Sequence, residues 1–202
     1  MNRKYRALLW DFDGVIFDSD KAVCRAVNVL LTHHGLQTIP YAEFRHRTDN
    51  HFEWYVKKGV TWGTEEIRNF FYRHYDTSDC GLVDGVSEVL AFAREQGLQN
   101  GIVSAHHTDD IRVKLARFGI DEHFPCVSGG TAHKKEALDE TCATLGVACS
   151  EALFVGDMLS DVRDGRAAGV TTVLLAPVDS PHASEAHHHI TDLRQLKSLF
   201  SV

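Results

Sequence analysis

The stretch ALLWDFDGVIFDS at residues 7–19 decides the fold. Its apolar run stops at Asp11, and further acidic residues and a glycine follow, which is typical of a buried strand in a parallel sheet. We predict that strand at residues 6–12. Strand alternation would aim Asp11 and Asp13 toward the same side, and Gly14 permits a tight backbone turn directly after them.

Strands and helices alternate along the chain on either side of one long interval. Apolar runs predict the strands, and helical spacing of apolar residues predicts the segments between them. Gly97 and Gly119 mark the ends of two of the helices. This alternation predicts an α/β fold with a parallel sheet and helices on both faces. The further strands are expected at 100–104, 124–128, 152–156 and 170–175, and the helices at about 85–97, 107–118, 134–146, 160–168 and 192–200.

Residues 19–81 break this alternation. The interval has no convincing buried strand, whereas its segments 19–35 and 64–75 show the helical spacing of apolar residues. We therefore predict a helical insertion between the two parts of one core, residues 1–18 and 82–202. Ten of the 19 aromatic residues lie in the insertion. We expect most of them to build its own core and its contact with the main domain; the alternative is that some line a closing lid.

Composition and charge exclude several classes of protein. The 202 residues are 44% hydrophobic and 24% charged, as in an ordinary soluble globular chain. A formal net charge of −7 argues against a broad basic surface for nucleic acid or anionic lipid. The five cysteines form no C-x-x-C pair, and the apolar run near the N-terminus is too short for a signal peptide or a membrane span. We expect a cytoplasmic protein with reduced thiols that binds neither nucleic acid nor membrane.

Polar residues stand where further predicted strands end or helices begin. Ser104 closes one strand, Asp157 and Asp161 follow another, and a lysine pair at 134–135 opens a helix. Each is commonly a helix cap or a solvated side chain when it occurs alone. In an open parallel sheet, however, ligands bind beyond the carboxyl ends of the strands, so these groups would converge with the carboxylates of the first strand. Carboxylates, a hydroxyl and an ammonium together suit a divalent cation and a phosphoryl group.

Four motifs of the chain resemble those of the haloacid dehalogenase superfamily of phosphohydrolases. They are DFDGVIFDS (11–19), VSA (103–105), the lysine that opens the helix at 134–146, and VGDMLSD (155–161). The resemblance runs over nearly the whole chain, and the insertion resembles the small C1 cap of the phosphoglycolate-phosphatase-like and phosphomutase-like branch. It implies a Rossmann-like catalytic core with a small helical cap domain. It also implies a Mg²⁺-dependent phosphatase that hydrolyses a small phosphate monoester through an aspartyl-phosphate intermediate.

The resemblance also implies roles for single residues. Asp11 would be the nucleophile that attacks phosphorus, and Asp13 would be the general acid and base. Ser104 would hydrogen-bond the oxygens of the transferring phosphoryl group, and Lys134 would neutralise their charge. Two more residues of the same motifs, Gly14 and Ala105, would bind the substrate.

A metal site follows from the same resemblance. Asp157 would bind Mg²⁺ together with Asp11 and the backbone carbonyl of Asp13, and Asp161 would support or join that shell. Without such an ion, three carboxylates facing a phosphate would repel the substrate. True haloacid dehalogenases resemble this family but lack the second aspartate of the first motif. The presence of that aspartate separates this chain from them.

The chain departs from the family pattern at two motifs. The stretch AHKKEAL has no proline after its lysine, where the branch usually has a Lys-Pro pair, so either Lys134 or Lys135 could reach the site. We favour Lys134 because of its spacing to the apolar residues that follow. His106 and His107 follow the second motif, and we expect a surface or helix-capping role for both, with contact to the substrate as the alternative.

Substrate choice is expected in the insertion, because a cap closes over the organic group of the phosphate. In the segment FRHRTDNHFEWY, Arg45 and Arg47 could clamp a second anionic group, since a guanidinium suits bidentate contacts. The alternative is that both are ordinary solvated helix residues.

Other functions remain open at this point. A phosphomutase of the same branch would use the same four motifs and return the phosphoryl group to a sugar. Phospho-acceptor signalling domains carry a similar set of aspartate, serine and lysine but are much shorter and have no cap. A non-catalytic binding protein is a further alternative. The expected partner is a small phosphorylated metabolite, and the expected assembly is a monomer or a homodimer.

Overall fold

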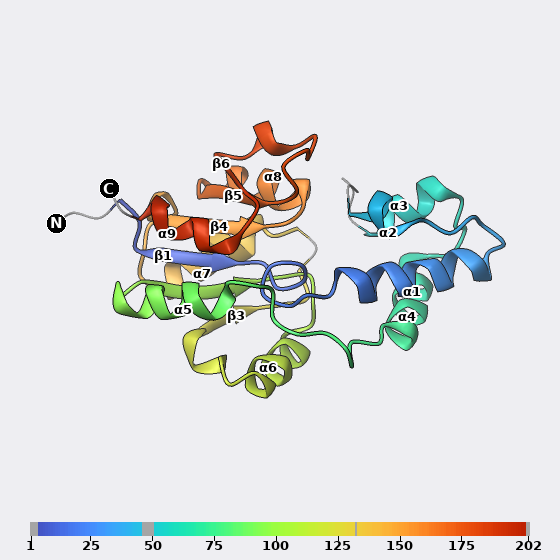
Figure 1. Ribbon diagram of the computed structural model, residues 1–202, viewed down its shortest axis with the longest axis horizontal. Helices are drawn as coiled ribbons and strands as arrows, with labels where there is room; N and C mark the ends of the chain where they lie inside the picture. The colour runs from blue at the N-terminus through green and yellow to red at the C-terminus, as the bar shows by residue number, and fades with distance from the viewer. Residues whose placement is uncertain (1–3, 46–50, 132, 201–202) are drawn as a thin grey trace. The chain divides into compact units, whose positions relative to one another are not determined.

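The computed structural model describes residues 4–45, 51–131 and 133–200 (Figure 1). It divides into two compact units, of which one comprises residues 1–17 and 82–202 and the other residues 18–81. None of the helices among the described residues is long and apolar enough to cross a membrane.

The first unit is built on a six-stranded, entirely parallel sheet in the order β3-β2-β1-β4-β5-β6. All four residues of the central strand β1 are buried, because neighbouring strands flank it and helices cover both faces of the sheet (Figure 1). The predicted fold class is therefore confirmed. The strands are β1 (Ala7–Trp10), β2 (Gln99–Val103), β3 (Cys126–Ser128), β4 (Ala152–Gly156), β5 (Thr171–Leu175) and β6 (His188–Ile190).

Helices connect the strands as the apolar spacing predicts. The last helix is shorter than expected, since 192–200 begins with the 3₁₀ turn Leu193–Gln195. The order of the strands reverses at β1. β2 and β3 lie on one side of β1, and the chain then passes through α7 and places β4 on the other side. Such a switch point opens a crevice at the carboxyl ends of β1 and β4. The helices are α5 (Val86–Glu95), α6 (Thr108–Arg117), α7 (Lys135–Thr144), α8 (Leu159–Ala168) and α9 (Leu196–Leu199).

One apolar core packs α7 and α8 onto the sheet. Leu9 of β1 and Phe154 of β4 contribute to it together with Leu138 of α7. The approach of α7 to β2 is close, because a Cβ atom on Gly101 would lie only 2.7 Å from Cγ2 of Thr141. This packing fixes the start of α7 relative to the strand ends.

The second unit is helical and has its own core. Its helix α1 packs against α4, and Phe44 and Tyr55 are buried in the shared apolar cluster. As the sequence predicts, most of the aromatic residues of this segment belong to that cluster. The two helices expected from apolar spacing are present, and two shorter ones lie between them. The four are α1 (Asp20–His33), α2 (Tyr41–Phe44), α3 (His51–Lys58) and α4 (Thr64–His74).

A buried hydrogen bond joins two neighbouring strands of the sheet and generates a prediction about stability. Nε1 of Trp10 in β1 donates to Oδ1 of Asn100 in β2 over 3.1 Å. The variant Asn100→Leu keeps the branching at Cγ but leaves the indole N–H without its acceptor, so we expect the free energy of unfolding to fall by about 1–3 kcal/mol. Chemical denaturation measures this change.

The neighbouring substitution Gln99→Leu is the matched control, because Gln99 lies on the same strand and is exposed. It should change the free energy of unfolding little. Equal stability of the two variants would show that the Trp10–Asn100 bond does not stabilise the sheet.

Candidate active site

The first motif begins where β1 ends. The strand stops at Trp10, two residues before its expected end, and Asp11 starts the loop that follows. The backbone N–H of Asp11 still donates to the carbonyl oxygen of Val155 in β4 over 2.9 Å. This bond holds the start of the loop against the strand that carries the fourth motif.

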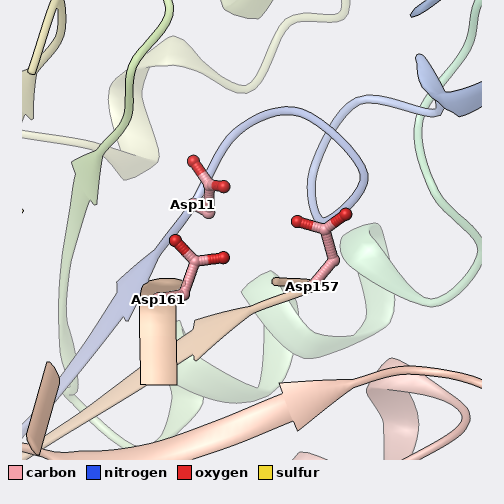
Figure 2. Close-up of side chains that lie close together, drawn as sticks. All are labelled: Asp11, Asp157 and Asp161. Atoms are coloured by element: carbon pink, nitrogen blue, oxygen red, sulfur yellow. The ribbon is translucent and has the colours of Figure 1, made fainter. Parts of the chain in front are cut away.

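Three carboxylates gather at this edge of the sheet (Figure 2). Asp157 directly follows β4, and Asp161 lies in the first turn of α8. One ligand oxygen of each of Asp11, Asp157 and Asp161 lies within 4.8 Å of the others. Asp11 and Asp161 are buried, whereas Asp157 is half-buried. The cluster can hold a metal ion, because hard divalent cations prefer carboxylate oxygen ligands.

Gly14 allows the first motif to turn above Asp157. Its φ angle is 74°, a left-handed conformation that favours glycine. A Cβ atom at this position would also lie 2.6 Å from Oδ2 of Asp157. The backbone of the loop and the carboxylate are therefore packed directly against each other, so the glycine positions a member of the acidic cluster.

Lys134 bridges two of the carboxylates from the residue before α7. Its Nζ atom lies 2.8 Å from Oδ2 of Asp11 and 2.7 Å from Oδ1 of Asp161. Its backbone N–H donates to Oδ2 of Asp164 over 2.7 Å, which anchors the start of the helix. Lys135 instead pairs with Asp139 on its own helix at 2.9 Å. Of the two lysines considered from the sequence, Lys134 is the one in contact with the cluster.

The buried charges of this cluster perturb one another. The pKa of Asp11 is raised to about 6, because burial and the neighbouring Asp161 raise it more than the Lys134 ammonium lowers it. Burial alone would lower the pKa of Lys134, but the two carboxylates raise it well above its usual value. Three carboxylates against one ammonium leave two negative charges. The cluster therefore matches the charge of a divalent cation.

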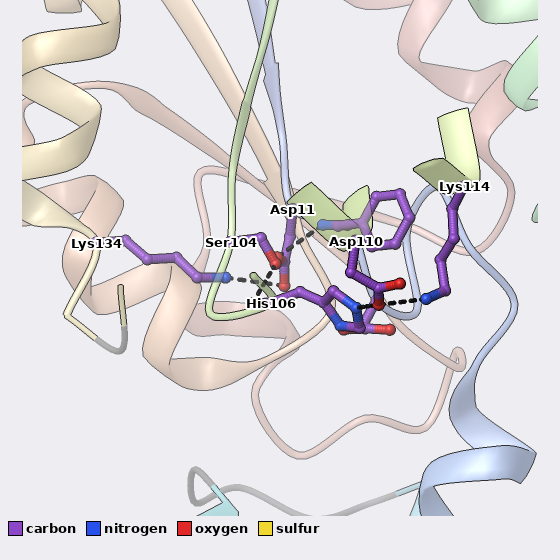
Figure 3. Close-up of polar contacts among 8 residues, drawn as sticks. Asp11, Ser104, His106, Asp110, Lys114 and Lys134 are labelled. Carbon is purple, nitrogen blue, oxygen red and sulfur yellow. Dashed lines mark hydrogen bonds and ion pairs between the residues drawn. The ribbon is translucent and has the colours of Figure 1, made fainter. Parts of the chain in front are cut away.

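The second motif lies at the end of β2, beside β1. Ser104 is buried, and its backbone N–H donates to the carbonyl oxygen of Ser128 over 2.9 Å. Its Oγ atom accepts a bond from the backbone N–H of His106 at 3.3 Å. Ala105 between them is exposed. Figure 3 draws the Ser104 hydroxyl at the same strand-end region as Asp11 and Lys134.

The surface or helix-capping role expected for His106 is wrong. The side chain is buried, and its Nδ1 atom lies 2.9 Å from Oδ2 of Asp13, while Nε2 contacts Oδ2 of Asp110. Burial would lower the pKa of His106, but the carboxylates of Asp13 and Asp110 raise it. His107, which precedes α6, is exposed. Asp110 lies four residues after His106, in the first turn of α6, and this spacing is the sequence signal that could have indicated the contact.

The arginines expected to bind substrate belong to the helical unit. Arg45 ends α2 and is exposed. Arg47 lies outside the described residues. Their proposed role in binding stays a prediction.

Comparisons with known proteins agree with the motifs. A family model described as haloacid dehalogenase-like hydrolase matches residues 8–175. A phosphoglycolate phosphatase of Photorhabdus laumondii is 29% identical over 184 residues, which cover 83% of this chain and 79% of the relative. One from Synechococcus elongatus is 28% identical over 177 residues, which cover 83% of this chain and 82% of the relative.

Solved structures share the fold. A haloacid dehalogenase-like family hydrolase from Streptococcus pneumoniae superposes with a TM-score of 0.81 at 14% identity, covering 98% of this chain and 99% of its own. CbbY from Rhodobacter sphaeroides, solved in complex with phosphate, has a TM-score of 0.75 at 17% identity, covering 98% and 100%. These likenesses concern the fold, whereas the family model rests on the sequence and spans most of the chain. The predicted resemblance is therefore confirmed, and this protein belongs to the haloacid dehalogenase-like hydrolase family.

Proposed function

We propose that this protein is a magnesium-dependent phosphatase that hydrolyses a small phosphate monoester through an aspartyl-phosphate intermediate. A phosphatase of the haloacid dehalogenase superfamily is the activity that the relatives support by name, as the sequence predicts. The observation that carries the mechanism is the ion pair of Asp11 with Lys134 inside the acidic cluster. That arrangement supplies a nucleophile, a fixed positive charge and oxygen ligands for a cation at one strand edge.

The donor set fits Mg²⁺. Asp11 and Asp157 would hold the ion with the backbone carbonyl of Asp13, and waters would complete the shell. Asp161 would support the site, because both of its carboxylate oxygens already accept hydrogen bonds. When bound, the ion neutralises negative charge and polarises the phosphoryl group.

In the first step, a carboxylate oxygen of Asp11 forms a bond to phosphorus while the bond from phosphorus to the leaving oxygen breaks. Asp13 donates a proton to that oxygen, so the alcohol leaves neutral. Lys134 favours the ionised form of Asp11 before the attack, because the ammonium opposes the effect of burial on its pKa. Lys134 and Ser104 then donate hydrogen bonds to the phosphoryl oxygens.

In the second step, water hydrolyses the aspartyl-phosphate. Asp13, now ionised, takes a proton from the water. The water oxygen forms a bond to phosphorus, and the bond from phosphorus to Asp11 breaks. Inorganic phosphate leaves and Asp11 returns to its starting form. The same aspartate thus acts as acid in one step and as base in the next.

We propose phosphoglycolate as the first substrate to test, because the curated relatives carry it in their names. Its carboxylate would be the second anionic group expected for Arg45 and Arg47, the latter outside the described residues. A cytoplasmic location and a monomeric or homodimeric assembly stay predictions.

The activity itself is tested by phosphate release from phosphoglycolate, sugar phosphates, nucleotides and an aryl phosphate. Release with Mg²⁺, its loss on addition of a chelator, and a fall of at least about 1,000-fold in Asp11→Asn are expected, because that variant lacks the nucleophile. Asp109→Asn, at an exposed position in α6, is the control and should keep full activity.

Full activity in Asp11→Asn would exclude the covalent mechanism. Transfer of labelled phosphate between positions of a sugar, without net release, would identify a phosphomutase instead.

Variants of Lys134 and Lys135 test which of the two lysines belongs to the third motif. Lys134→Met removes the ammonium that pairs with Asp11, so we expect kcat to fall by about 100- to 1,000-fold. We also expect the free energy of unfolding to fall by about 3 kcal/mol, since two buried carboxylates lose their counter-charge. Lys135→Met should leave kcat and stability nearly unchanged. The reverse ranking would assign the motif to Lys135.

Gly14 provides a test of the proposed metal site. In Gly14→Ala the new methyl group would meet the carboxylate of Asp157, so we expect the Mg²⁺ concentration for half-maximal activity to rise about tenfold or more. Gly97→Ala introduces the same left-handed strain, at a φ of 64°, where nothing lies within 4 Å. Equal effects of the two substitutions on Mg²⁺ dependence would rule out the contact with Asp157 as the cause.

A further inference from the structure

Four titratable side chains form a continuous chain that begins at Asp13. Figure 3 labels the other three members, His106, Asp110 and Lys114. His106 lies between Asp13 and Asp110, with one ring nitrogen facing each carboxylate, and Nζ of Lys114 contacts the same Asp110 oxygen that faces the ring. His106 is only 3% exposed, whereas the Asp13 side chain is 32% exposed. A half-exposed carboxylate is thus held by a buried partner.

The backbone around His106 is fixed by several bonds. Its carbonyl oxygen accepts from the N–H of Gly130 at 2.8 Å, and its own N–H donates to Oγ of Ser104 at 3.3 Å. A Cβ atom on Gly129 would lie 2.4 Å from that carbonyl oxygen, so the neighbouring loop passes directly over it. The ring of Phe12 packs 5.5 Å from the imidazole, centroid to centroid. The imidazole therefore occupies a defined place beside the first motif.

The far end of the chain is fixed as well. Asp110 and Lys114 pair one turn apart on α6, and Lys114 is buried with its ammonium 5.5 Å from the centre of the Phe17 ring. A carboxylate that is held by a lysine on a regular helix has little freedom to turn. Asp110 can therefore fix the orientation of the imidazole through Nε2.

We propose that His106 is a positioning residue for Asp13, anchored by Asp110 and Lys114 on α6, and that it holds Oδ2 so that Oδ1 transfers the proton to and from the reacting oxygens. This inference rests on the proposed phosphatase function. Precise placement of an acid matters, because a small displacement of a reacting group lowers the rate strongly. Asp110 and Lys114 thereby support the reaction, although neither would touch the substrate.

A misplaced Asp13 should affect the hydrolysis of alkyl and aryl phosphates differently. An alkyl phosphate releases an alkoxide that needs the proton from Asp13, whereas 4-nitrophenyl phosphate releases a phenolate that leaves without one. Hydrolysis of the aspartyl-phosphate needs Asp13 as base for both substrates. A misplaced Asp13 should therefore slow both steps with the alkyl substrate and only the second step with the aryl substrate.

The test compares His106→Ala with His107→Ala, its exposed neighbour. With an alkyl phosphate, we expect kcat of His106→Ala to fall about 100-fold while KM stays within about twofold. With 4-nitrophenyl phosphate, rapid mixing should show a burst of one nitrophenolate per active site at nearly the original rate, followed by slow turnover. His107→Ala should match the unsubstituted protein in both assays.

Two further variants separate positioning from a general loss of structure. His106→Asn should recover at least about tenfold of the lost kcat, because the amide nitrogen of asparagine takes about the place of Nδ1. The double variant Asp13→Asn/His106→Ala should be no slower than Asp13→Asn alone, since residues that act through one another are not additive.

The outcomes against the proposal are distinct. Loss of the nitrophenolate burst in both His106 variants, or a full additional loss in the double variant, would assign His106 another role. Unchanged kcat in His106→Ala would overturn the positioning role of His106 and leave the proposed phosphatase function standing. If the unsubstituted protein releases no phosphate from any substrate, the proposed function fails and this inference fails with it.

Discussion

The contact of Lys134 with Asp11 and Asp161 is the interaction on which the rest of the site depends. A buried carboxylate without a counter-charge is costly, and here three carboxylates share one strand edge. One ammonium placed 2.8 and 2.7 Å from two of them offsets part of that cost. The remaining negative charge favours a divalent cation. The charge balance of the cluster therefore links the stability of the core to the metal ion that we propose for this site.

The sheet topology is what brings that lysine to the cluster. Asp11 follows β1 and Asp161 lies in the helix after β4, and these two strands are neighbours across the switch point. Lys134 is supplied by the connection between β3 and β4. The core packing of α7 on the sheet sets the position of its first residue. An apolar interaction thus determines the geometry of a polar one, since a shift of α7 would move the ammonium away from both carboxylates.

The parts of the structure that local sequence determines could be predicted. Five of the six strands, the helical insertion and the groups at the strand ends follow from apolar periodicity and from motifs at fixed spacing, so the sequence predicts that Asp11, Asp157 and Lys134 lie together. The role of His106 is not predicted, because its ring contacts Asp13, which lies 93 residues away in the sequence. The short helices α2 and α3 were not predicted either, because a segment of so few residues gives only a weak periodic signal.

Asp11 and Asp13 lie two residues apart and would perform different chemistry in the proposed mechanism. Asp11 is buried and paired with a permanent cation, which favours the ionised form that a nucleophile requires. Asp13 is more exposed and contacts the imidazole of His106, whose pKa the neighbouring carboxylates raise. An environment of that kind suits a residue that must give up a proton and take one back in each turnover. The fold therefore separates the two roles by the partner of each carboxylate, the lysine that precedes α7 for one and a histidine held by α6 for the other.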